Sequence, residues 1–269
     1  MSVELASPAV RPAAVAGSFY PADREALSSE VARLLGAAAP GPVPKALIAP
    51  HAGYVYSGPV AASAFRRVER APISCVVLLG PAHYARLRGA ALPECRWFAT
   101  PLGEVPVAAT GAARADAPPD LPRDRLAHER EHSLEVEVPF LQMALPAGFI
   151  LVPILVGDAD PADTARILDA LWGGPETLVV VSSDLSHYLP WETARRADAA
   201  TAAKIVALRP VAADDACGAA PVNGLLAAAR RRKLRAELID LRNSGDTAGD
   251  RSRVVGYGAF AFYEDGGRA

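Results

Sequence analysis

Short runs of β-branched residues and leucine alternate with alanine- and leucine-rich stretches, and this alternation constrains the fold more than any other feature of the chain. The apolar runs predict strands over 45–49, 74–80, 149–156, 177–183, 235–242 and 254–263. The intervening stretches predict helices over 23–36, 57–70, 133–145, 161–172, 192–208 and 221–232. Strands separated by helices favour a largely parallel sheet with helices on both faces. We therefore expect an α/β protein whose three α/β/α layers enclose a mostly parallel or mixed sheet.

The net charge and the composition of the chain exclude several classes of partner. A formal charge of -2 on 269 residues provides neither a basic face for nucleic acid nor a polybasic membrane signal. The apolar runs are too short to cross a bilayer, and the N-terminus lacks a signal-peptide pattern. With no internal repeat or long linker, we expect a single domain over 1–269 and a cytoplasmic location. The three cysteines, Cys75, Cys95 and Cys217, have no C-x-x-C spacing and support neither a disulfide framework nor a cysteine zinc site.

Histidine is scarce in this chain, and its positions are informative. Of the five histidines, three follow a predicted strand within a few residues: His51 after 45–49, His83 after 74–80 and His187 after 177–183. Ligands of open α/β sheets bind in the crevice outside the carboxyl ends of the strands. A single histidine in such a place is most simply a hydrogen-bonded loop residue. Three of them favour a shared site.

The remaining two histidines form the pattern H-E-x-x-H at 128–132, which is typical of zinc-protease helices. That reading needs His128 and His132 on one face of a continuous helix, followed by a third ligand. Pro139 limits such a helix, and no suitable ligand follows. A helix that begins near His132 or Ser133, with acidic residues at 135 and 137 in its first turn, fits the sequence better. We therefore expect the match to be accidental.

Six segments of the chain resemble the Memo family, which in bacteria is also called AmmeMemoRadiSam system protein B. They are AVAGSFYPAD (14–23), APHAGYVYSG (49–58), LLGPAHY (78–84), EHSLEVEVPFLQ (131–142), SSDLSHY (182–188) and NSGDTAGDRSRVVGYGAFAF (243–262). The family is similar to the class III extradiol dioxygenases, in which two histidines and a glutamate hold a non-haem iron. The resemblance implies an extradiol-dioxygenase-like fold and a metal-binding pocket.

The resemblance also implies roles for individual residues. His51 and His83 match the two imidazole ligands, and His187 matches the acid/base histidine beside the metal. Further positions that line the same pocket match Asp184, His132 and Glu131. On this basis His132 belongs to the site and His128 does not.

The third metal ligand is where the sequence departs from the family pattern. Animal Memo proteins carry a thiol in the corresponding C-terminal segment, and an ungapped comparison places Thr247 there. No cysteine follows Cys217. Asp246 can supply a carboxylate instead, with Asp250 as a second candidate, and two histidines with one carboxylate suit Fe(II). The alternative is that this segment is only a tight Gly/Asp turn. We expect a divalent transition metal, with iron first and copper or zinc as alternatives.

Three functions follow from these residues. The first is a metal-dependent, dioxygenase-like oxidoreductase in which His187 moves a proton and Asp184 orients His187. The second is a non-catalytic module that binds metal and a small molecule or peptide, working with the radical SAM partner that the bacterial family name implies. The third is a hydrolase with Ser182 or Ser183 as nucleophile, although the G-x-S-x-G elbow is missing.

Overall fold

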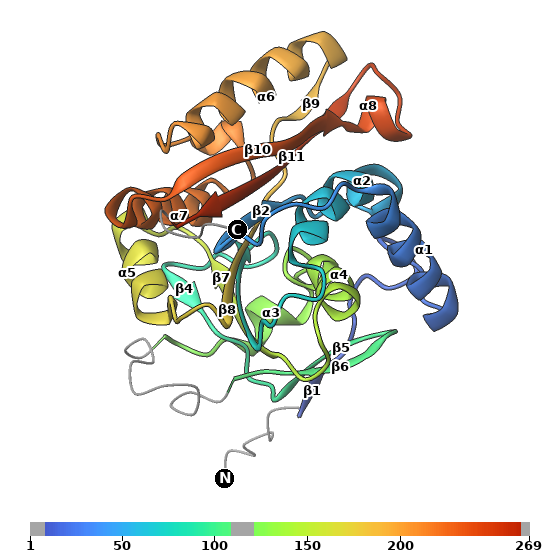
Figure 1. Cartoon of the computed structure of the whole chain (residues 1–269), viewed down its shortest axis with the longest axis vertical. Coiled ribbons are helices and arrows are strands. Elements are labelled where there is room, and N and C mark those ends of the chain that lie inside the picture. Colours follow the sequence, from blue (N-terminus) through green and yellow to red (C-terminus); the bar gives the residue numbers. More distant parts are fainter. Residues whose placement is uncertain (1–8, 109–120, 265–269) are drawn as a thin grey trace.

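The computed structural model describes residues 9–108 and 121–264 (Figure 1). Its strands are β1 (Val10–Arg11), β2 (Ala46–Ala49), β3 (Cys75–Pro81), β4 (Ala90–Ala91), β5 (Trp97–Thr100), β6 (Gly103–Pro106), β7 (Ile150–Val156), β8 (Thr177–Ser182), β9 (His187–Leu189), β10 (Arg235–Asn243) and β11 (Val254–Tyr263). The α-helices are α1 (Arg24–Ala37), α2 (Tyr54–Phe65), α3 (Arg125–Glu129), α4 (Val138–Ala144), α5 (Pro161–Leu171), α6 (Trp191–Val206), α7 (Ala219–Arg232) and α8 (Ser244–Thr247). Short 3-10 helices are η1 (Arg66–Val68), η2 (Glu135–Glu137) and η3 (Ala213–Asp215).

The main sheet is mixed, with the strand order β10-β11-β2-β8-β3-β7-β4. Its centre is parallel, because β2 pairs with β8, β8 with β3 and β3 with β7 in the same direction. Antiparallel neighbours flank this centre: β10 and β11 on one side and β4 on the other. β9 lies off this path and pairs with β11, while β1, β5 and β6 form a separate small sheet. The expected mostly parallel or mixed sheet is confirmed.

Helices cover both faces of the main sheet, which makes the fold a three-layer α/β/α arrangement (Figure 1). Successive residues of one strand point to opposite faces, so Leu78 of β3 packs in the core beneath α1, α2 and α4. Its neighbour Leu79 packs in the other core, against α5, α6 and α7. Strands buried on both faces explain why the apolar runs in the sequence are continuous rather than alternating.

All six predicted strands are present, with their ends within one residue of the expected positions. The helix expected over 133–145 is different: it begins as the 3-10 turn η2, and α4 follows with Pro139 in its first turn. Proline is tolerated there because its missing N–H would have no helical partner. The sequence did not indicate the short elements β1, β4, β5, β6, β9, α3 and α8. Over the residues described, none of the helices has the length and apolar character needed to cross a membrane.

Candidate metal centre

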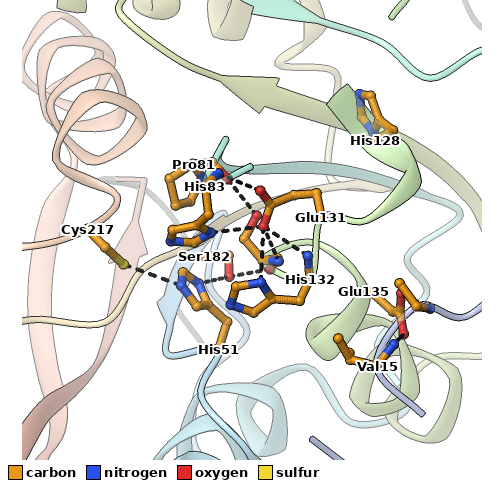
Figure 2. Close-up of polar contacts among 12 residues, drawn as sticks. Val15, His51, Pro81, His83, His128, Glu131, His132, Glu135, Ser182 and Cys217 are labelled. Carbon is orange, nitrogen blue, oxygen red and sulfur yellow. Dashed lines mark hydrogen bonds and ion pairs between the residues drawn. The ribbon is translucent and has the colours of Figure 1, made fainter. Parts of the chain in front are cut away.

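Three imidazoles meet at the carboxyl ends of the central parallel strands. His51 follows β2 and His83 follows β3, while His132 enters from the loop between α3 and η2. Figure 2 shows the three rings facing one another, with centroids 5.2 Å apart for His51 and His83 and 4.7 Å apart for His83 and His132. One nitrogen of each ring lies within 4.8 Å of the others. This three-histidine group could hold a metal ion.

The ring of His51 is fixed by a buried hydrogen-bond network. Ser182 Oγ lies 2.7 Å from His51 Nδ1, 2.6 Å from the Ser133 carbonyl oxygen and 2.7 Å from Glu137 Oε1. Because a carbonyl oxygen can only accept, the single hydroxyl hydrogen points to Ser133, and Nδ1 of His51 donates to Oγ. Burial raises the pKa of Glu137 well above its ordinary value, which favours the neutral acid next to Oγ. His51 Nε2 therefore carries the lone pair.

Glu131 holds His83 and the loop of His132. Its Oε1 atom accepts from His83 Nδ1 at 2.9 Å and from the N–H groups of His132 and Ser133, each at 2.9 Å. Its Oε2 atom accepts from the His83 N–H at 2.5 Å. Burial alone would raise the pKa of Glu131, but the hydrogen bond and charge of His83 together with the backbone N–H groups lower it to about 2. An ionised carboxylate on Nδ1 orients a histidine so that Nε2 can bind a metal.

Two imidazoles of this group, those of His51 and His132, are neutral donors. Burial lowers the pKa of His51 well below its ordinary value and that of His132 to about 4. Neighbouring imidazoles lower these pKa values further, since protonating one ring disfavours protonating the next. Metal ligation requires unprotonated nitrogen. The donor set and its protonation therefore fit a divalent transition metal.

A cavity of about 700 Å³ adjoins the three histidines. Besides them it is lined by His187, Asp184 and Cys217, and by tyrosines at positions 56, 84, 188 and 257. His187 lies where β9 begins, and its Nδ1 atom donates to the carbonyl oxygen of Leu185 at 2.8 Å. Burial lowers the pKa of His187, so this ring is also neutral near pH 7. The cavity is large enough for a small organic molecule beside a metal ion.

Asp184 lines the cavity but does not orient His187 as the sequence suggested. Its Oδ1 atom accepts from the backbone N–H of His51 at 2.8 Å, and the carbonyl of Leu185 takes the expected place at His187. Burial raises the pKa of Asp184 to about 7. Asp184 thus supports the strand end that presents His51.

In the C-terminal segment, the acidic residues Asp246 and Asp250 do not lie as the sequence predicted. Asp246 Oδ1 accepts from Trp191 Nε1 at 2.7 Å and Oδ2 accepts from the Asn243 N–H at 3.1 Å, so this carboxylate caps α8. The structure places neither Asp246 nor Thr247 among the residues that line the cavity, whereas Asp250 lines it. The segment between β10 and β11 folds as the short helix α8 followed by a loop, rather than as a tight turn, and Asp246 as third ligand stays a prediction.

The H-E-x-x-H match is accidental in this structure. α3 ends at Glu129, so His128 and His132 do not share a helix. His128 Nε2 donates to the carbonyl of Ala91 at 3.0 Å, and Figure 2 shows the ring of His128 apart from the cluster. The serine-hydrolase reading also fails, because Ser182 and Ser183 are fully buried and neither contacts His187.

A buried ion pair supports the loop that carries Glu131 and His132. Arg11 of β1 lies 2.5 Å from Glu135 Oε2, and it donates to the carbonyl oxygens of His128 and Glu131. Glu135 also accepts from Tyr20 Oη at 2.5 Å. No local feature of the sequence indicates these contacts, because Arg11 and Glu135 lie 124 positions apart. Cys217 was missed as a member of the site for the same reason, and Ser182 was considered only as a nucleophile and not as the partner of His51.

Fold and site together define an α/β protein with a three-histidine group, suited to a metal ion, at the carboxyl edge of a mixed sheet. The model of the Memo-like protein family matches residues 11–261, and the chain belongs to the Memo family. It is 35% identical to a MEMO1 family protein of Aquifex aeolicus, over 92% of this chain and 97% of that protein. A MEMO1 family protein of Methanococcoides burtonii is 36% identical, over 93% and 98%. One from Aeropyrum pernix is also 36% identical, over 93% and 98%.

Proposed function

We propose that this protein binds a divalent transition metal through His51, His83 and His132 and uses it in dioxygenase-like oxidation of a small molecule in the adjoining cavity. The observation that supports this proposal is the meeting of three imidazoles at the strand ends. Imidazole suits iron, copper and zinc alike. Iron is the metal we propose first, because the proposed reaction consumes oxygen.

The surrounding residues prepare the imidazoles for this task. Ser182 and Glu131 occupy the Nδ1 atoms of His51 and His83, which leaves the Nε2 atoms for the metal. Partners of this kind fix the ring orientation and raise the basicity of the ligand. A bound ion with open coordination positions supplies the redox chemistry and Lewis acidity that the reaction needs.

His187 is the residue that we propose for proton transfer. Since its Nδ1–H donates to Leu185, its Nε2 atom carries the lone pair. The ring is neutral and lines the cavity, so it can accept a proton from a substrate hydroxyl and return it later. Replacing His187 should lower turnover without releasing the metal, whereas replacing His51 should release it.

Elemental analysis of anaerobically purified protein tests the metal site. We expect about one transition metal ion per chain in the native protein and none in the His51→Ala, His83→Ala double variant. His128→Gln is the matched control, since it changes a buried histidine outside the cluster, and it should keep the metal. A double variant that retains as much metal as the control would overturn the proposed site.

A second measurement tests the reaction. After anaerobic loading with Fe(II), oxygen uptake is followed with catechols as probe substrates. Uptake that depends on His187 supports an oxygenase. Tight metal retention without uptake would contradict the oxidation and favour the alternative function.

The alternative is a non-catalytic module that recognises a small molecule or peptide. The exposed tyrosines at the cavity favour it, because Tyr56, Tyr84 and Tyr188 all line the cavity and stay accessible to solvent. Exposed aromatic rings suit recognition of a partner, since they bury large areas on binding. In this alternative the protein works with a radical SAM partner. Replacing Tyr84 and Tyr188 with alanine should then weaken ligand binding without changing metal content.

A further inference from the structure

A buried carboxylate of α6, Asp198, lies behind the segment that carries His187. α6 packs on β10 and β11, and β9 pairs with the first residues of β11 (Figure 1). Asp198 is only 2% exposed, and its Oδ1 atom accepts a hydrogen bond from the backbone N–H of Ser186 at 3.0 Å. Asp198 therefore contacts the residue next to the histidine that we propose for proton transfer.

A single peptide unit connects Asp198 to His187. The C=O of Leu185 and the N–H of Ser186 belong to the same peptide bond, and they point in opposite directions because this bond is planar and trans. The N–H donates to Asp198 Oδ1, and the C=O accepts from His187 Nδ1 at 2.8 Å. The carboxylate, the peptide and the imidazole thus form one continuous chain of hydrogen bonds.

Strand β11 holds this peptide unit in place. The N–H of Leu185 donates to the carbonyl of Gly256 at 2.8 Å, and the N–H of Gly256 donates to the carbonyl of Ser186 at 2.8 Å. A Cβ added at Gly256 would lie 2.1 Å from Asp198 Oδ2, so only glycine lets the carboxylate come this close to the strand. A side chain at position 256 would displace the carboxylate from the Ser186 N–H.

The surroundings of Asp198 do not compensate its charge in the usual way. Burial raises the pKa of this carboxyl, whereas the Ser186 N–H lowers it. Over the residues that the structure describes, Oδ2 has no hydrogen-bond partner and Asp198 forms no ion pair. Burying a carboxylate without a cation costs free energy. A buried acid of this kind, beside a cavity-lining histidine, is therefore a candidate for a functional role.

A carboxylate at one end of a peptide changes the acceptor at the other end. Hydrogen bonds in a chain polarise one another, so the carboxylate on the Ser186 N–H increases the negative charge on the Leu185 oxygen. That oxygen becomes a stronger acceptor for the Nδ1–H of His187. The neutral ring is then held with its hydrogen on Nδ1 and its lone pair on Nε2, and the ring is stabilised when Nε2 takes up a proton.

We propose that Asp198 is the positioning residue of His187. Through the peptide between Leu185 and Ser186, it holds the imidazole in the tautomer that can accept a proton at Nε2, and it stabilises the protonated ring. This inference rests on the proposed role of His187, and it gives Asp198 the part that the sequence suggested for Asp184. The proton moves between the substrate hydroxyl and Nε2, and Asp198 neither gains nor loses one.

An NMR titration of the imidazole rings tests this inference. Long-range ¹H–¹⁵N spectra of the metal-free full-length protein report the tautomer and the pKa of each ring, and His187→Gln identifies the signals of His187. Asp198→Asn is the key variant, because asparagine keeps an acceptor oxygen for the Ser186 N–H and loses the charge. We expect this variant to lower the pKa of His187 by about 0.5–1 unit relative to the wild type.

Glu192→Gln is the matched control. It also removes one negative charge from α6, but the Glu192 side chain is exposed and lies 3.9 Å from Arg195. This control should leave the pKa of His187 unchanged, because solvent screens an exposed charge. The same pKa of His187 in Asp198→Asn and in the wild type would overturn the inference. An equal fall in Glu192→Gln would overturn it as well.

These spectra need neither metal nor oxygen, so their outcome is independent of the proposed oxidation. Oxygen uptake by the iron-loaded protein provides a second readout. In Asp198→Asn the acid limb of the pH profile should move to lower pH by the same amount as the pKa of His187, with KM unchanged. An acid limb that stays in place would contradict the role of Asp198. Absence of uptake in the wild type would overturn the proposed oxidation alone.

Discussion

Replacing Glu131 with glutamine is the most direct test of how the site is held in place. The carboxylate accepts four N–H groups, from the backbones of His83, His132 and Ser133 and from the ring of His83. Glutamine has nearly the same shape but one acceptor oxygen fewer, and its NH₂ group must face at least one of these donors. The substitution therefore removes a charge and buries a donor against a donor without creating a cavity.

The cost follows from two independent arguments. The fall in the pKa of Glu131 from 4.5 to about 2 corresponds to about 3 kcal/mol of stability at neutral pH. A buried donor left without an acceptor costs about 1–3 kcal/mol, and more beside a charged partner. Because the folded-state pKa lies below that of the unfolded chain, this contribution is complete above about pH 4.5 and disappears as the pH falls through about 2. The disorientation of His83 should also weaken metal binding by about 10- to 100-fold.

Urea unfolding of the metal-free protein at pH 7 measures the first effect, and titration with Co(II) measures the second. Glu129→Gln is the matched control, because Glu129 is half exposed and pairs with Arg125 only at 3.4 Å on the surface. Surface pairs of this kind contribute less than about 1 kcal/mol. If Glu131→Gln unfolded at the same urea concentration as Glu129→Gln and bound cobalt equally well, the reasoning would be refuted.

Three further predictions concern the supporting network. Ser182→Ala removes the group that fixes the ring of His51 and should lower Co(II) affinity by about 10- to 100-fold in calorimetry; an unchanged affinity would contradict the network. Arg11→Met leaves Glu135 as a buried charge without its cation and should cost about 3–5 kcal/mol in urea unfolding, whereas a loss below about 1 kcal/mol would show the pair to be dispensable. Burial lowers the pKa of His128 from 6.5 to about 4, so between these pH values the unfolded chain binds a proton that the folded protein does not. The free energy of unfolding should therefore fall by about 3 kcal/mol as the pH drops from 6.5 to 4. Urea unfolding of His128→Gln at both pH values should show a smaller fall, and a fall equal to that of the wild type would refute this origin.

The sequence was sufficient for the fold and for part of the site. Strands buried on both faces appear as continuous apolar runs, so their positions could be predicted without knowing their neighbours. The carboxyl ends of parallel strands meet at one edge, and this rule brought His51 and His83 together from residues 32 positions apart. It also placed His187 at the same edge, where it lines the cavity.

The rest of the site could not be predicted because it depends on which loop packs against which strand end. Cys217 comes to His51 only because α7 packs on β3 and β8 and the loop before it passes over Ser182 and Ser183. Nothing in the local sequence indicates that packing. The segment around Asp246 shows the opposite case. Its carboxylate is chemically suited to ligation, but the backbone N–H of Asn243 and the indole N–H of Trp191 already donate to it. Composition alone does not distinguish a cap from a ligand.

Three carboxylates within seven residues show most clearly why environment decides their chemistry. In the sequence, the acids at 135 and 137 resemble helix first-turn residues that would interact with the dipole from a solvent-exposed surface. In the structure all three side chains are buried. Each has a different partner: Glu131 contacts His83, Glu135 contacts Arg11, and Glu137 contacts Ser182. Donors lower the pKa of Glu131, while burial raises that of Glu137. One stretch of chain therefore supplies a carboxylate that orients His83 and an acid with a raised pKa that contacts Ser182, the partner of His51.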